Sequence, residues 1–304
     1  MSLDLVVAIL MAAAGAATPL LIAALGELVV EKSGVLNLGV EGMMLIGAVA
    51  GFAVSYTTGV PALGAVAALL AGALVSLVFA LLTLSLMANQ VATGLALAIF
   101  GTGVSALAGA PFVGITTTTL GPLVAFDDPI LRLLFGQSPL VYLALLLTLA
   151  VWWFLKHSRQ GLILRAVGES SDAAHAIGYP VLKIRYLAVL FGGAMAGLAG
   201  SYYSLVLTPM WAERLTAGRG WIAIALVVFA SWKPGRLLLG AYLFGFVITM
   251  ELQAKAAGFA LFAPEFLSAL PYLATIVVLA VISLGRRNAT HAPACLGKPF
   301  RPAV

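Results

Sequence analysis

Long apolar runs, separated by short polar or Gly/Pro-rich breaks, divide this chain into nine segments. A helix that crosses the apolar core of a bilayer needs about 20 residues, and most of the runs approach or exceed that length. Because a segment inside lipid must satisfy its own backbone hydrogen bonds, each run is predicted to be helical. The runs cover residues 5–30, 38–56, 61–87, 91–110, 139–155, 186–207, 221–232, 237–252 and 267–284.

Two of these runs differ from simple membrane-crossing helices. Run 221–232 would form a helix of about 18 Å, which is shorter than the bilayer core of about 30 Å. Run 38–56 begins with Gly39, Glu41 and Gly42, which favours a broken or re-entrant start. We therefore predict an all-α polytopic membrane protein: one transmembrane domain over residues 1–304, with about 8–10 transmembrane helices including broken or re-entrant segments.

The composition agrees with a membrane protein. Of the 304 residues, 62% are hydrophobic and only 9% are charged, whereas soluble domains contain about 25% charged residues. A soluble enzyme, a nucleic-acid-binding protein and a disordered chain are therefore excluded as classes, and the lipid bilayer is the expected surrounding.

The positions of the basic residues predict an orientation. Eleven of the 16 Lys and Arg residues lie in the stretches 156–185, 233–236 and 286–304. An excess of Lys and Arg marks the cytoplasmic side, and the number of crossings between these stretches places all three on one side. We predict a cytoplasmic loop at 156–185 and a cytoplasmic C-terminal tail at 286–304. The loop 111–138 is then external, with a short helix at 130–135.

The chain lacks the sequence motifs of an enzyme that would work inside the membrane. It contains no P-loop, no His-Glu-x-x-His and no Gly-x-Ser-x-Gly motif. Its one cysteine, Cys295, cannot form an internal disulfide or a Cys-based metal site. We predict a protein that is not an enzyme, with no cofactor, no metal and no catalytic residue.

Few polar residues fall at membrane depth, and these are costly enough to suggest function. Glu41 is either a hydrogen-bonding hub for a broken helix or part of a solute path. Asn89 and its neighbours either cap a helix or line that path, and the cap is favoured. Glu27 and Glu31 are predicted at the cytoplasmic interface. The candidates for the translocation path are Asn37, Glu41, Asn89 and Thr93.

The loop 156–185 contains the signals of a very short helix. Ser170 or Ser171 can cap its start, Gly178 can end it, and Pro180 prevents its continuation. Its apolar residues Ala173, Ala174 and Ile177 would form a small face. Such a helix could insert into a cleft of another protein.

Two motifs resemble a known family. The pattern Glu169-x-x-x-Ala173-Ala174-x-x-x-Gly178 resembles the EAA-type loop of ABC importer permeases, whose coupling helix docks on an ATPase. The stretch 26–44 resembles the signature of the branched-chain amino acid/simple-sugar permease family, and in detail its nucleoside-type branch. Segments 216–225 and 294–300 agree, although Cys295 and Phe300 replace the expected Ala and Tyr. The resemblance implies that coupling to the ATPase rests on Glu169, Asp172, Ala173, Ala174 and Gly178.

The resemblance further implies a transmembrane permease subunit of an ATP-binding-cassette importer for nucleosides, in the bacterial inner membrane. Its expected partners are a second permease subunit that completes a heterodimer, an ATPase with two cassettes and an extracytoplasmic binding lipoprotein. Simple sugars or branched-chain amino acids are alternative solutes. An alternative of another class is an ion-coupled secondary transporter or channel that works alone.

Overall fold

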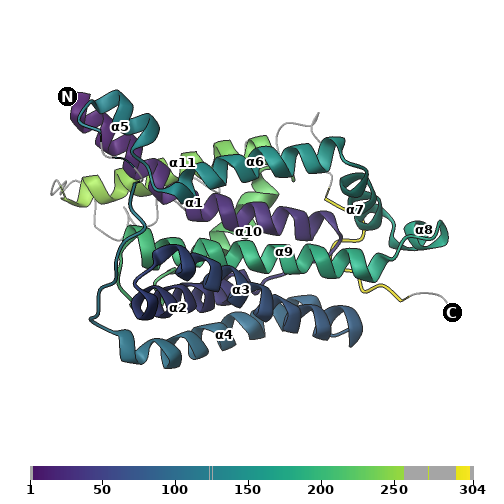
Figure 1. Cartoon of the computed structure of the whole chain (residues 1–304). Coiled ribbons are helices and arrows are strands. Elements are labelled where there is room, and N and C mark those ends of the chain that lie inside the picture. Colours follow the sequence, from purple (N-terminus) through teal and green to yellow (C-terminus); the bar gives the residue numbers. More distant parts are fainter. Residues whose placement is uncertain (1–2, 123, 125, 257–272, 274–291, 302–304) are drawn as a thin grey trace.

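The computed structural model describes residues 3–122, 124, 126–256, 273 and 292–301, and it shows an elongated bundle of helices (Figure 1). Within these residues there is no β-strand, only the isolated bridges Val113–Trp211 and Thr116–Met210. Seven helices of the described part are long and apolar enough to cross a membrane. The prediction of an all-α polytopic membrane protein is confirmed.

The helices follow the apolar runs closely. The ninth run, 267–284, lies outside the described residues apart from Leu273. The helices are α1 (Leu3–Lys32), α2 (Val40–Thr58), α3 (Pro61–Ala80), α4 (Gln90–Gly109), α5 (Pro129–Phe135), α6 (Pro139–His157), α7 (Arg159–Glu169), α8 (Ser171–Ala176), α9 (Val181–Tyr202), α10 (Arg219–Phe229) and α11 (Pro234–Ala256). One-turn π-helices continue α3 (Leu81–Ser85) and α9 (Tyr203–Leu207), and a 3₁₀ turn (Ala110–Phe112) continues α4.

The two ends of the bundle carry different short helices (Figure 1). At one end, α5 lies beside the start of α1, where Arg132 and Asp4 form an exposed ion pair of 3.4 Å. This helix matches the one predicted at 130–135. The other end carries α7, α8 and the C-terminal segment. Stretch 156–185 is therefore mostly helical, and α7 is an element that the sequence analysis did not predict.

Helices α2, α3 and α9 form the tightly packed centre of the bundle. A Cβ atom on Gly197 of α9 would collide with the backbone oxygen of Ala68 on α3, and one on Gly47 of α2 would collide with Gly197 itself. Small residues let helix backbones approach closely where lipid supplies no hydrophobic driving force. These glycines thus pack helices against one another within one chain.

We expect Gly197→Leu to prevent the protein from accumulating, because the new side chain must push two neighbouring helices apart. Overpacking a close contact costs about 1–3 kcal/mol, and a backbone collision costs more. The matched control is Gly103→Leu on α4, where an added Cβ meets nothing within 4 Å. Fluorescence-detected size-exclusion chromatography of solubilised membranes checks this. Equal monodisperse peaks for both variants would contradict the packing argument.

Candidate functional site

A short helix begins inside the bundle rather than at its surface. Helix α10 has 11 residues and is about 16 Å long, roughly half of the bilayer core. Just after it, the indole Nε1–H of Trp232 donates to Glu31 Oε2 at 2.6 Å, one residue before the end of α1. The N-terminus of α10 therefore lies about halfway along the bundle. Residues 208–218, which lead to it, are not helical, although Trp211 and Thr216 are fully buried.

The carboxylate of Glu41, in the first turn of α2, holds this start in place. It accepts hydrogen bonds from the Thr216 hydroxyl at 2.5 Å, the Gly218 amide at 2.8 Å and the Gly220 amide at 2.6 Å. A negative group is favourable beside the exposed amides of a helix N-terminus. The sequence allows two interpretations of Glu41, a hydrogen-bonding hub or part of a solute path. These contacts match the hydrogen-bonding hub. We call Glu41, residues 208–218 and the first turn of α10 the central junction.

A cation and a phenol also meet at the central junction. The Arg219 guanidinium lies 4.9 Å from the centre of the Tyr203 ring. The hydroxyl of Tyr203 is buried and has no hydrogen-bond partner in the described part of the chain. Broken helices near mid-membrane present such polar groups to solutes in transporters. The sequence analysis did not single out Tyr203 or Arg219 as site residues, although Arg219 stands within the 216–225 segment of the family resemblance.

Backbone strain is concentrated at the two ends of α10. Arg214 and Ala217 precede the helix with φ of 55° and 47°, and Ser231 and Trp232 follow it with φ of 51° and 54°. Positive φ in a residue other than glycine costs about 1–3 kcal/mol and persists only where surrounding contacts enforce it. The hydrogen bonds to Glu41 and Glu31 supply such contacts at either end.

The other three predicted path residues, Asn37, Asn89 and Thr93, take no part in the hydrogen bonds of the central junction. Asn37 is fully buried, and its Oδ1 accepts from the Gly39 amide at 2.9 Å, so it shapes the turn into α2. Asn89 caps α4 by accepting from the Ala92 amide at 3.0 Å, as favoured from the sequence. Thr93 is buried one turn further along α4.

The carboxylates of Glu27 and Glu31, predicted at the cytoplasmic interface, are covered by other parts of the chain. Both side chains are buried inside the bundle, with exposed fractions of 1% and 0%. Glu27 accepts from the Asn37 amide at 3.2 Å, while Glu31 accepts from Trp232. The turn after α1, α9 and α10 cover this part of α1, and such long-range packing leaves no signal in the local sequence.

We expect Trp232→Phe to lower the thermal stability of the purified protein. The change removes the only described hydrogen bond to the buried Glu31 carboxylate, and bonds to charged groups contribute about 1.5–3 kcal/mol. Trp153→Phe on α6 is the control, since Trp153 is 58% exposed. The melting temperature in detergent, followed with a fluorescent dye that does not react with thiols, measures the effect. Equal shifts in the two variants would show that the Glu31 contact contributes little.

Helix α8 is fixed at one end of the bundle and exposed on its outer face. The Ser170 hydroxyl accepts from the Ala173 amide at 3.4 Å, and Gly178, at φ 91°, follows the helix. Both features match the sequence prediction. Ala174 is buried against Val167, Val181 and Phe300, whereas Ile177 is 71% exposed.

The apolar residues of α8 therefore do not share one face, which corrects the prediction made for Ala173, Ala174 and Ile177. Ala174 anchors the helix to its own chain. The outward surface consists of exposed residues within α8 and directly before and after it: Glu169, Asp172, Ala173, Ile177 and Gly178.

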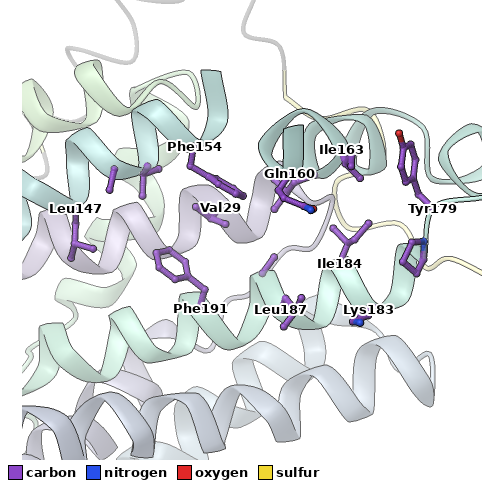
Figure 2. Close-up of a pocket in the computed structure, with 15 residues that line it drawn as sticks. Val29, Leu147, Phe154, Gln160, Ile163, Tyr179, Lys183, Ile184, Leu187 and Phe191 are labelled. Atoms are coloured by element: carbon purple, nitrogen blue, oxygen red, sulfur yellow. The ribbon is translucent and has the colours of Figure 1, made fainter. Parts of the chain in front are cut away.

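A groove of about 780 Å³ lies between α1, α6, α7 and α9. Figure 2 shows its apolar wall, which includes Leu147, Leu187 and Phe191, and the polar residues Gln160, Tyr179 and Lys183 toward the end that carries α7 and α8. A hydrophilic solute would lose most of its hydrogen bonds against such a wall. We therefore place the candidate path at the central junction and not in this groove.

In the described part of the chain, seven helices long and apolar enough to span a membrane, with the short helix α10 starting inside the bundle, define a polytopic membrane protein. The chain belongs to the family described as branched-chain amino acid transport system / permease component, whose model matches residues 9–282.

Similar proteins include sugar and nucleoside permeases. A putative glucose ABC transporter permease of Haloferax volcanii is 43% identical, covering 87% of this chain and 88% of its own length. A guanosine ABC transporter permease of Bacillus subtilis is 31% identical over 93% of both chains. A nucleoside ABC transporter permease of Lactococcus lactis is 29% identical over 90% of this chain and 92% of its own. The search of solved structures found no match.

This membership assigns the chain to the permease subunits of ABC importers. Such permeases are not enzymes, because ATP hydrolysis takes place on a separate subunit, and they work together with that ATPase and a substrate-binding protein.

Proposed function

We propose that this chain forms half of the transmembrane path of an importer for solutes that carry a sugar ring, with nucleosides as the first candidate. Two relatives that align over about nine-tenths of this chain are named for guanosine or nucleosides. Glucose is the second candidate, favoured by the 43% identity with the putative glucose permease. The ribose of a nucleoside and a free hexose share the hydroxyl-rich ring that a polar junction would meet.

The observation that carries the coupling role is the exposed helix α8 on a firmly packed base. Glu169, Asp172, Ala173 and Gly178 would contact the ATPase, while Ala174 holds α8 against the permease itself. The basic stretches 156–185 and 286–304 support a cytoplasmic position for α8 and the C-terminus. The described residues 292–301 lie against the same end of the bundle, which is consistent with one side for both.

In this proposal the path runs past the central junction. Glu41, Arg219 and Tyr203 would guide the solute there, with Thr93 on α4, the helix that packs against α2. The proposed partners are a second, different permease subunit, an ATPase with two cassettes and an extracytoplasmic binding lipoprotein. The proposed location is the bacterial plasma membrane.

Reconstitution tests the function. The permease pair, the ATPase and the binding protein are placed in liposomes, and uptake of radiolabelled adenosine and of radiolabelled glucose is measured with ATP. We expect uptake of one of the two, abolished by a hydrolysis-deficient ATPase. Transport by this chain alone without ATP would overturn the proposal in favour of a secondary transporter or channel. Ligand binding by the isolated binding protein distinguishes the two solutes.

A further inference from the structure

One buried arginine connects three separate parts of the chain. Arg185, near the start of α9, is only 1% exposed. Its Nε donates to the Ser33 carbonyl at 3.2 Å, its Nη2 to the Ser171 hydroxyl at 2.9 Å and its Nη1 to the Lys298 carbonyl at 3.1 Å. These acceptors belong to the turn after α1, to α8 and to the C-terminal segment.

All three acceptors are neutral. Among the described residues, no ion pair includes Arg185. Burying a charge without a paired carboxylate is unfavourable, and an apolar side chain of similar length would fill the space more cheaply. An apolar side chain, however, lacks the planar guanidinium, which donates hydrogen bonds in several fixed directions at once. The arrangement therefore points to a role in fixing α8 relative to the other two segments.

The C-terminal residues 292–301, which we call the tail segment, reinforce the same connection. The Cys295 amide donates to the Gly168 carbonyl at 2.9 Å, and the Gly297 amide donates to the Gly34 carbonyl at 3.1 Å. Phe300 is buried against Ala174 of α8, with its ring 5.5 Å from that of His175. The tail segment thus touches α8, the end of α7 and the turn after α1.

That turn leads directly to the central junction. Ser33 and Gly34 are followed by Asn37, which binds the Gly39 amide at the start of α2, and Glu41 lies in the first turn of the same helix. A displacement of α8 would therefore reach Glu41 through a short series of hydrogen-bonded segments, with no flexible linker between them.

We propose that Arg185, as a positioning residue, and the tail segment form a rigid link that transmits movement of α8 to the start of α2. This inference rests on the proposed coupling role of α8. The link acts after the ATPase has docked. Without it, the ATPase still hydrolyses ATP, but hydrolysis no longer drives movement of the solute.

The test uses the complete reconstituted importer with Ser171→Ala and Arg185→Met. Ser171→Ala removes the bond between Arg185 and α8, together with the bond that the Ser171 hydroxyl donates to the Val167 carbonyl of α7. Arg185→Met keeps the length of the side chain and leaves the Ser171–Val167 bond in place. Lys183→Met is the matched control, because Lys183 is an exposed cation half a turn away on α9. We expect both variants to assemble with the ATPase and to hydrolyse ATP at near wild-type rates. The uptake per ATP hydrolysed should fall about tenfold, within the usual range of coupling energies.

Cys295 provides a second readout, since it is the only cysteine in the chain and is partly buried. Maleimide should label Cys295 faster in Arg185→Met than in Lys183→Met, because the tail segment loses its bond at Lys298. An unchanged ratio of uptake to hydrolysis in Ser171→Ala would overturn the link, as would a parallel loss of both activities. Failure of the wild-type complex to transport would instead contradict the proposed function, so the two failures are distinguishable.

Discussion

Glu41→Ala is expected to abolish uptake and to destabilise the protein strongly. The substitution removes the acceptor of three hydrogen bonds: two buried ones, from Thr216 and Gly220, and a partly buried one from Gly218. Each donor left buried without a partner costs about 1–3 kcal/mol. Since α10 is also preceded by a strained residue, Ala217, its start would have no other hydrogen bonds of this strength to hold it.

Glu41→Gln refines this expectation. The amide keeps one acceptor oxygen but presents an NH₂ group to at least one of the backbone amides, so partial stability and little uptake are expected. Glu251→Ala on α11 serves as the control. Glu251 forms an i,i+4 ion pair with Lys255 at 2.7 Å, and pairs of this kind contribute only about 0.3–0.5 kcal/mol.

Uptake in liposomes and the melting temperature in detergent measure the effect of these changes. Wild-type values for Glu41→Ala would show that the junction is held by other contacts.

Gly178→Asp and Glu169→Arg are expected to abolish uptake while the protein remains abundant in the membrane. Both positions are exposed beside α8, and an added side chain at Gly178 meets nothing within 4 Å of its Cβ. Neither new side chain collides with the fold, and the backbone strain that Asp meets at φ 91° is local to Gly178. In the proposed complex the new side chains would stand in the contact with the ATPase, adding bulk or reversing a charge.

Gly59→Asp is a closely matched control for Gly178→Asp. Gly59 has φ 72°, its Cβ position is equally open, and it lies after α2 at the opposite end from α8. The same backbone strain is thus introduced away from the proposed ATPase contact. Co-purification with the ATPase and uptake in liposomes are the measurements. Normal uptake by both α8-end variants, or equal loss in Gly59→Asp, would argue against the coupling surface.

The membrane architecture could be predicted because its signal is local. A run of apolar residues in lipid has no alternative to a helix, so the eight described runs correspond to α1, α2, α3, α4, α6, α9, α10 and α11. The cap at Ser170 and the stop at Gly178 are likewise local signals, since each acts on amides within a few residues. The short length of α10 also follows directly from the sequence.

The contacts that build the site are not local. Glu41 binds residues about 175 positions away, and Arg185 joins Ser33 to Lys298. The sequence could therefore mark Glu41 as unusual without identifying its partners. Helix α7 was missed because its charged residues Arg159, Arg165 and Glu169 interrupt the apolar pattern, although Ile163 and Leu164 are buried on one face.

The glycine contacts of α2, α3 and α9 have a mechanical consequence. Three helices whose backbones touch cannot slide past one another without opening voids, so this group should behave as one stiff block. Helix α10 also packs its apolar side chains into the core, but it is bounded at both ends by strained residues, each end next to a buried carboxylate. We expect the conformational change of transport to be concentrated at the two ends of α10, so that α10 rotates relative to the rigid group formed by α2, α3 and α9.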